Sequence, residues 1–225
     1  MRVLLFGATG MIGQGVLREC LLAPEVELVQ TVGRSPVQSQ HPAVRDFVHK
    51  DLWNYSGVES MLTGFDACFF CLGVTSAGMS EPEYERITYG IAIAAGATLL
   101  RLNPAMTLIF VSGVGADSTE KGRIMRARVK GRTENALLRL PFKAVYVFRP
   151  VVVQPLHGIK SRTALYRVLY SSLGPLLTML RRVMPGQIVT TEEIGRAMIA
   201  LVSRPYPRTI LGNREIGEIA RSVDA

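Results

Sequence analysis

The chain has 225 residues, of which 48% are hydrophobic, and its 26 basic and 18 acidic residues give a formal net charge of +8. This length and apolar content predict one large folded domain with a sizeable core. No apolar run is long and uncharged enough for a membrane span, and the N-terminus lacks the pattern of a secretory signal peptide. We therefore expect neither a membrane-spanning protein nor a disordered one.

The first predicted elements are a strand at residues 3–6 and a helix at 12–22, joined by the turn Gly7-Ala8-Thr9-Gly10-Met11-Ile12-Gly13. Glycines spaced by three allow a tight turn, close approach of the backbone to a pyrophosphate, and close packing of the helix on the strand. The free N–H groups of the first helical turn then face the phosphates, where the helix dipole favours negative charge. This pattern predicts a nucleotide-binding βαβ unit; the alternative is a glycine-rich turn with only a packing role.

Strands and helices alternate along the rest of the chain up to residue 148. Further strands are predicted at residues 26–32, 45–49, 65–72, 107–111 and 144–148, and further helices at 58–62, 81–102 and 123–139. This alternation predicts parallel strands joined by right-handed crossovers. The expected fold class is therefore α/β with a doubly wound parallel sheet, the NAD(P)-binding Rossmann fold.

Past Pro155 the pattern changes, which divides the chain into a predicted dinucleotide-binding domain at 1–155 and a small C-terminal helical cap at 156–225. Residues 163–184 form a basic, apolar helical stretch, and Thr191 starts a last helix with acidic residues in its first turn. We expect the cap to pack on the same domain, over the carboxyl edge of the sheet where ligands of such folds bind.

Gly33-Arg34 follows the second predicted strand, about 20 residues after the glycines, where an NAD site usually has an acid for the ribose hydroxyls. An arginine can pair instead with a 2′-phosphate. Because no acid occupies this turn, the sequence favours NADP(H) over NAD(H) as the cofactor. The alternative is that Arg34 is an exposed loop cation.

The three cysteines are Cys20, Cys68 and Cys71. Within a strand, Cys68 and Cys71 point to opposite faces, so a metal pair is not expected and no metal ion is predicted. We interpret all three as structural thiols of a protein located in the reducing cytoplasm.

The basic excess gathers at residues 123–139 and 160–182 and suits an anionic ligand or surface. No zinc-finger, RNP or helix-turn-helix motif accompanies it, so we expect no specific nucleic acid partner. The apolar stripe within 163–184 is flanked by arginines and suits a pocket cover or a dimer partner. Weak association with an anionic membrane surface is the alternative.

Further motifs follow the glycine turn and Gly33-Arg34 in a recognisable order. They are Asp51-Leu52, Cys71-Leu72-Gly73, Ser112-Gly113-Val114-Gly115-Ala116-Asp117, Val129-Lys130-Gly131-Arg132-Thr133-Glu134 and Phe148-Arg149-Pro150. Together they resemble the short-chain dehydrogenase/reductase superfamily, in particular its atypical NAD(P)-binding branch of NmrA-like and epimerase-like proteins. The resemblance covers residues 1–155 well and the remainder loosely.

The resemblance implies a cofactor site, a small-molecule substrate and, as in many members, a homodimer paired through the helices after the fourth and fifth strands. Gly7, Thr9, Gly10, Met11, Ile12 and Gly13 would hold the pyrophosphate, Arg34 the adenosine phosphate, and Asp51 and Leu52 the adenine. Leu72, Gly73 and Val74 would line the ribose and nicotinamide side, Lys130 would bind the nicotinamide ribose, and Pro150 and Val153 would border the nicotinamide ring.

The catalytic residues implied by the resemblance are Lys130 and Ser112, whose hydroxyl would polarise the substrate. Active members place a tyrosine four residues before the lysine, and its phenol exchanges a proton with the substrate oxygen. Arg126 stands at that position, and an always-charged guanidinium cannot act as the acid. The usual Tyr–Lys site is therefore incomplete.

Other side chains could supply the missing proton donor. The candidates are Tyr84, Tyr89, Tyr166, Tyr170 and His157. Packing is the favoured role for the tyrosines, whereas His157 follows the sixth strand on the expected ligand edge.

Two functions therefore stay open. The first is an NADP(H)-dependent oxidoreductase or epimerase of a small, apolar carbonyl or hydroxyl compound, with an unconventional proton donor. The second is a protein that binds NADP(H) without turnover and serves as a sensor or scaffold, as in the NmrA-like type. Lys130 and Ser112 favour the first function, and the missing tyrosine favours the second.

Overall fold

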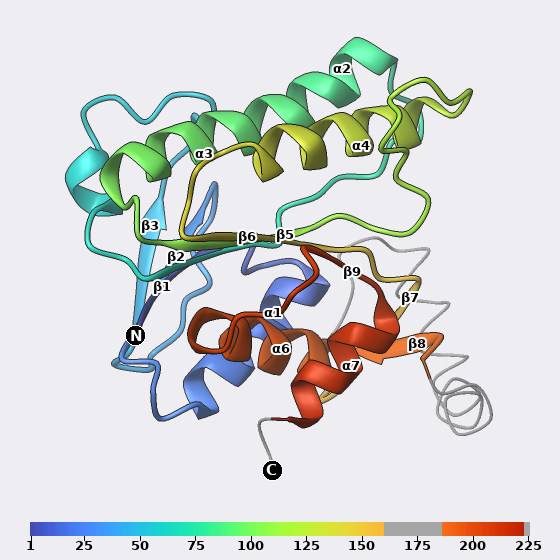
Figure 1. Ribbon diagram of the computed structural model, residues 1–225. Coiled ribbons are helices and arrows are strands. Elements are labelled where there is room, and N and C mark those ends of the chain that lie inside the picture. Colours follow the sequence, from blue (N-terminus) through green and yellow to red (C-terminus); the bar gives the residue numbers. More distant parts are fainter. Residues whose placement is uncertain (160–185, 223–225) are drawn as a thin grey trace.

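The computed structural model describes residues 1–159 and 186–222 of the chain. Within them, a seven-stranded parallel sheet has the strand order β3-β2-β1-β4-β5-β6-β9 (Figure 1). Its strands are β1 (Arg2–Phe6), β2 (Leu28–Gly33), β3 (Val44–Val48), β4 (Ala67–Phe70), β5 (Thr107–Val111), β6 (Ala144–Phe148) and β9 (Ile210–Leu211). The expected doubly wound α/β fold is confirmed.

Helices cover both faces of the sheet (Figure 1). The upper layer in the view contains α3 (Ile91–Leu102) and α4 (Met125–Leu138), and the lower layer contains α1 (Met11–Leu22), α6 (Thr191–Ser203) and α7 (Asn213–Arg221). Alternation along β1 divides its side chains between two cores, with Leu4 and Phe6 in one and Val3 and Leu5 in the other. Burial on both faces explains the continuous apolar runs of the strands.

The helical stretch after β4 is less regular than predicted. The short helix α2 (Glu81–Glu85) continues through a π-helical turn at Arg86–Gly90 into α3. Trp53, from the loop after β3, donates an indole hydrogen bond of 2.9 Å to the backbone oxygen of Arg86. A Cβ on Gly90 would lie only 3.2 Å from that indole nitrogen, so the glycine makes room for the ring. The widened turn thus accepts a side chain from the ligand edge.

Helix α6 packs closely on α1 through two glycines. A Cβ on Gly15 of α1 would lie 2.5 Å from Cβ of Thr191, and a Cβ on Gly195 of α6 would lie 2.7 Å from Cγ of Glu19. The α6 start is the predicted one, because the Thr190 side chain and Glu193 form a capping box there. Close contacts at these glycines therefore attach α6, in the C-terminal part of the chain, to α1.

The described part of the chain after residue 155 does not lie where we expected. It adds β9 to the sheet edge and α6 and α7 to the α1 face, rather than covering the carboxyl edge. Two unpredicted short strands, β7 (Val152–Gln154) and β8 (Ile188–Thr190), form a separate parallel pair. Strands this short show too little periodicity to be read from sequence. The helix expected at 163–184 lies outside the described residues, and the boundary at 155 stays a prediction.

The cysteines behave as predicted from strand alternation. Cys68 belongs to the core beneath α3 and α4, whereas Cys71 packs against the core on the α1 side. Burial raises the pKa of Cys20, Cys68 and Cys71, so the thiols are protonated at neutral pH. Among the described residues, no helix combines the length and apolar character needed to cross a bilayer.

Candidate dinucleotide and active site

The predicted ligand residues gather at one edge because parallel strands end together. The register pairs Phe6 at the end of β1 with Phe70 of β4, Phe70 with Phe110 of β5, and Val111 with Phe148 of β6. The loops that follow these strands therefore start side by side. Since β1 lies between β2 and β4, this edge contains the point where the strand order reverses, the usual ligand crevice of such sheets.

The glycine turn has the geometry that a close backbone approach requires. Gly7 has φ +77°, and a Cβ there would lie 2.7 Å from the backbone nitrogen of Leu72 after β4. A Cβ on Gly13 would lie 2.1 Å from the backbone oxygen of Gly7, so helix and turn could not pack with any side chain there. At Gly10 a Cβ would approach only Gly7 O, at 3.3 Å. The Gly10 side of the turn is therefore open for a ligand.

The amino end of α1 is suited to an anion. Gly10 is the N-cap and provides no side-chain cap, and the first turn contains no acidic residue. Thr9, Met11 and Ile12 are half-buried around this end, and Gln14 donates a hydrogen bond of 3.1 Å to the backbone oxygen of Thr9. Uncapped N–H groups at a helix start bind phosphates. The residues present thus fit a dinucleotide pyrophosphate.

The expected adenosine end lies at the ends of β2 and β3. Arg34 is exposed directly after β2 and forms no ion pair with a described residue. Asp51 is exposed and accepts a hydrogen bond of 3.0 Å from the backbone N–H of Trp53, whereas Leu52 is 2% exposed and belongs to the core. Contact of Leu52 with an adenine would therefore run through its backbone.

Asp46 of β3 shapes the segment that carries Arg34, and sequence reasoning missed it. It accepts hydrogen bonds of 2.5 Å from the Thr31 hydroxyl and of 3.0 and 3.1 Å from the backbone N–H groups of Val37 and Gln38. Burial opposes ionisation, but these hydrogen bonds outweigh it and lower the pKa of Asp46. A carboxylate in the middle of a predicted strand was the signal that could have identified it.

The expected nicotinamide side corresponds to the loops after β4, β5 and β6. Leu72 and Val74 are half-buried and Gly73 is exposed, next to the glycine turn. Pro150 is buried, and its backbone oxygen accepts a hydrogen bond of 3.0 Å from Val114 N–H. Val153 lies in β7 and is 7% exposed, so its side chain belongs mainly to the core.

Lys130 and Ser112 are brought together as the resemblance implies. The Lys130 ammonium donates a hydrogen bond of 3.0 Å to the backbone oxygen of Ser112, and Gly113 leaves space for it, since a Cβ there would lie 3.0 Å away. The Ser112 hydroxyl is buried without a partner among the described residues. Burial, followed by the nearby Arg126, lowers the pKa of Lys130 against the opposing effect of Glu134.

The described tyrosine candidates for the missing proton donor form no hydrogen bond with Ser112 or Lys130. Tyr84 is 1% exposed, and burial raises its pKa. Tyr89 stacks against Arg132 at 5.1 Å from the guanidinium carbon to the ring centroid. Tyr166 and Tyr170 lie outside the described residues. Among the described candidates, Lys130 is the titratable group that contacts Ser112 directly, through the backbone oxygen of that residue.

His157 belongs to a polar network rather than to the Lys130 site. It has φ +57° and hydrogen-bonds through Nε2 to Glu192 at 2.9 Å. Ligand atoms of His157, Glu192 and Glu19 lie within 4.8 Å of one another, a spacing that could hold a metal ion. However, Arg196 pairs with both carboxylates, at 3.3 Å from Glu19 and 3.1 Å from Glu192. Arg18 also pairs with Glu19, so two guanidinium groups compensate the two carboxylates.

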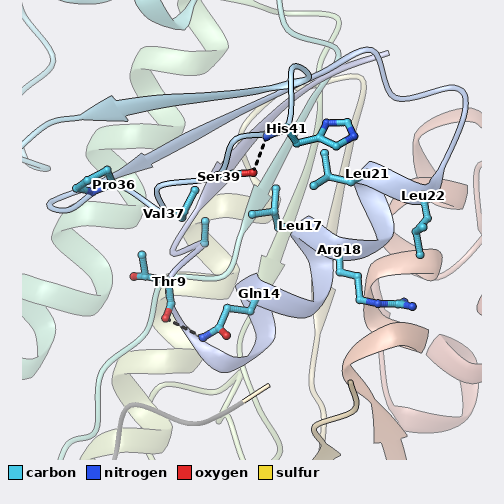
Figure 2. A pocket seen from close by; sticks show the side chains of 11 residues that line it. Thr9, Gln14, Leu17, Arg18, Leu21, Leu22, Pro36, Val37, Ser39 and His41 are labelled. Carbon is cyan, nitrogen blue, oxygen red and sulfur yellow. Dashed lines mark hydrogen bonds between the residues drawn. The ribbon is translucent and has the colours of Figure 1, made fainter. Parts of the chain in front are cut away.

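A cavity of about 650 Å³ lies beside the adenosine end and was not predicted (Figure 2). Its lining comes from the glycine turn, from α1 and from the segment after β2, namely Ala8, Thr9, Gln14, Leu17, Arg18, Leu21, Leu22, Pro36, Val37, Ser39 and His41. Leu17 and Leu21, one helical turn apart on α1, point into the same space (Figure 2). The cavity shares Ala8 and Thr9 with the turn and so extends the candidate cofactor site.

No protein-family model matches the chain. It is similar over its full length to the FMP52 protein, mitochondrial, of Debaryomyces hansenii, with 23% identity over 236 residues and complete coverage of both chains. The FMP52 protein, mitochondrial, of Eremothecium gossypii is 28% identical over 211 residues, covering 89% of this chain and 88% of that protein.

Solved structures of nucleotide-dependent enzymes have the same fold. A UDP-N-acetylglucosamine 4-epimerase from Methanobrevibacter ruminantium superposes with TM-score 0.67 at 14% identity, over 100% of this chain and 82% of that one. A short-chain dehydrogenase/reductase family oxidoreductase from Burkholderia thailandensis gives 0.64 at 16% identity, over 94% and 90%. The Bordetella bronchiseptica enzyme WbmF, in complex with NAD+, gives 0.61 at 13% identity, over 99% and 77%. At these identities the matches show the shared fold, and the NmrA-like and epimerase-like branches of the resemblance both stay predictions.

The relatives contradict the expected cytoplasmic location. Four of them, at 23%, 24%, 26% and 28% identity, are named mitochondrial. Reduced thiols and the lack of a secretory signal pattern distinguish only reducing from secretory compartments. Those two features therefore gave no basis for choosing the cytoplasm.

Proposed function

We propose that the protein binds a nicotinamide dinucleotide at the carboxyl edge of its sheet and acts as an oxidoreductase or epimerase on a small carbonyl or hydroxyl compound. The glycine turn carries this proposal. Gly7 and Gly13 tolerate no side chain, while the open Gly10 side adjoins an uncapped helix start. A turn needed only for packing would not require an open, donor-rich face.

Ser112 and Lys130 provide the reactive end of the proposed site. A nicotinamide dinucleotide supplies a hydride donor or acceptor when bound. The unpartnered Ser112 hydroxyl can hydrogen-bond the substrate oxygen, and the Lys130 ammonium 3.0 Å from the same residue can hold the ribose. Because its pKa is lowered, Lys130 is also the described group best suited to exchange a proton in place of the missing tyrosine.

The proposed cofactor preference is NADP(H). Arg34 is exposed at the end of β2 with its guanidinium available for a 2′-phosphate. The turn after β2 contains no acid that would bind the ribose hydroxyls of NAD(H).

The second candidate function is a cofactor sensor or scaffold without turnover. Two observations favour it: Arg126 replaces the usual proton donor, and burial makes Tyr84 a poor substitute for that donor. Cofactor binding is common to both functions and cannot separate them.

Stopped-flow absorbance at the nicotinamide band separates the two. The protein with bound NADPH is mixed with a panel of aldehydes, ketones and quinones, next to Lys130→Ala and the surface control Lys143→Ala. Oxidation that depends on Lys130 and not on Lys143 is the expected result. Tight NADPH binding without oxidation across the panel would favour the sensor, and absence of NADPH and NADH binding would overturn both candidates.

A further inference from the structure

The side of α4 that faces the candidate site carries cations without acidic partners. Arg126 and Lys130 are four residues apart in α4 and so lie on one side of the helix. Arg126 is exposed and forms no hydrogen bond or ion pair with any described residue. Lys130 bonds only to the backbone oxygen of Ser112 within the described part of the chain. Neither of these two cations forms an ion pair with a carboxylate among the described residues.

The other arginines of α4 show that this lack of pairing is local. Arg128 pairs with Glu81, and Arg132 pairs with Glu85, so both arginines contact acids of α2. The acid one turn beyond Lys130 is Glu134, which is fully buried and pairs with Arg149. None of these carboxylates is left to neutralise Arg126.

Electrostatic coupling places Arg126 close to the reactive pair. Its charge contributes to the lowered pKa of Lys130 and also opposes the raised pKa of Tyr84 on the neighbouring helix. Arg126, one helical turn before Lys130 and exposed, is thus close enough to both side chains to act on their ionisation. The first turn of α4 contains no acidic residue, so the helix dipole adds to the positive potential there.

The two loops next to the Lys130 ammonium each expose an apolar side chain. Val114 after β5 is 52% exposed, and Val151 after β6 is 46% exposed. The two loops are joined by the hydrogen bond of 3.0 Å from Val114 N–H to the backbone oxygen of Pro150. Large exposed apolar side chains beside unpaired cations suit a ligand with an apolar body and one anionic group.

We infer that the substrate is an apolar carbonyl or hydroxyl acid whose carboxylate binds the guanidinium of Arg126, while its reacting oxygen lies at the Ser112 hydroxyl. Arginine binds carboxylates with two parallel hydrogen bonds, which orients the substrate as well as attracting it. The arginine at the tyrosine position is thus a substrate-binding residue. This inference rests on the proposed function, since it concerns the same site.

Calorimetry with a matched pair of probes tests the inference. Phenylglyoxylate carries the carboxylate, and 1-phenylpropane-1,2-dione replaces it by a neutral acetyl group of similar size. Both are titrated into protein saturated with NADP+, so that binding is measured without turnover. We expect the acid to bind about ten- to hundredfold more tightly than the dione, the usual range for a charge-assisted pair.

Two arginine variants locate the effect. Arg126→Gln is expected to remove the preference for the acid while leaving dione and NADP+ affinity unchanged. Arg132→Gln, on the same helix but paired with Glu85, is expected to keep the preference. Equal binding of both probes to the natural protein, no binding of the acid, or equal losses in both variants would overturn the inference. Failure of both NADP+ and NAD+ to bind would instead overturn the proposed function, so the two outcomes are distinguishable.

Discussion

The Lys130 ammonium donates a hydrogen bond of 3.0 Å to the backbone oxygen of Ser112, while the hydroxyl of the same serine is buried without a described partner. A buried hydroxyl without a hydrogen bond is unfavourable, so it marks a place where a ligand can bind. Of the two side chains, only that of Lys130 gains or loses a proton in the ordinary pH range, so only Lys130 leads to a pH-dependent prediction.

Lys130 predicts a specific pH dependence of stability. Burial and Arg126 lower its pKa in the folded state below the ordinary value of 10.5. Between these two pKa values the unfolded chain binds more protons, so stability attributable to Lys130 rises with pH and is lowest below the folded-state pKa. We expect urea titrations to show that the unfolding free energy of the natural protein, minus that of Lys130→Met, increases from neutral pH toward pH 10.5. A constant or falling difference would contradict the lowered pKa.

Gly13 and Gly10 should respond differently to the same substitution. Gly13→Ala places a Cβ 2.1 Å from the backbone oxygen of Gly7, and such overpacking should lower the unfolding free energy by about 3 kcal/mol. Gly10→Ala meets only a 3.3 Å contact and should change stability by less than about 1 kcal/mol, the scale of an N-cap change.

Gly10→Ala should still weaken NADPH and NADH binding by about tenfold or more, because the methyl group occupies the pyrophosphate face. Chemical denaturation and fluorescence titration measure the two effects; unchanged cofactor affinity in Gly10→Ala would refute the proposed cradle.

Arg34 should determine the choice between the two nicotinamide cofactors. Arg34→Asp is expected to weaken NADPH binding by about a hundredfold through loss of a charge-assisted contact, with little loss for NADH. Lys50→Asp, an equal charge change in the exposed segment after β3, is the control for a general field effect. Equal losses of both cofactors in Arg34→Asp would show that Arg34 is only an exposed loop cation.

The buried pair of Glu134 and Arg149 should be important for stability. Glu134 is 0% exposed and accepts a hydrogen bond of 2.9 Å from Nε of Arg149. Arg149→Met leaves the carboxylate buried alone and should cost about 3 to 5 kcal/mol, whereas the double replacement Glu134→Met/Arg149→Met should recover much of that loss. Breaking the exposed Arg132–Glu85 pair by Arg132→Met should cost less than about 1 kcal/mol. Additive losses in the double variant, measured by urea denaturation, would mean that the two residues do not act as a pair.

Much of the fold was predictable because its signals are local. The strands at 107–111 and 144–148 begin and end as predicted, since continuous apolar runs between turn residues reflect burial on both faces of a parallel sheet. The glycine turn was also readable, because the demands on Gly7 and Gly13 come from contacts within a few residues or with the adjacent strand end. Alternation likewise placed Cys68 and Cys71 on opposite faces.

The parts that were not predictable depend on partners distant in the sequence. Strand β9 is two residues long, and only its pairing with β6 makes it a strand. The packing of α6 under the sheet depends on Gly15 and Gly195, which lie 180 positions apart in the chain (195 − 15). Neither feature leaves a periodic pattern that a local reading could detect.

The sequence by itself determined the fold class and the residues available at the ligand edge, because backbone preferences and apolar periodicity act over a few residues. It also identified Arg126 at the position of the missing tyrosine, but there the substitution indicated only a loss. The tertiary structure decided which charges are balanced: Arg128, Arg132 and Glu134 find partners on other elements, and Arg126 finds none among the described residues. Ion pairing depends on distances of a few ångströms between side chains from separate elements, and only the folded chain defines those distances.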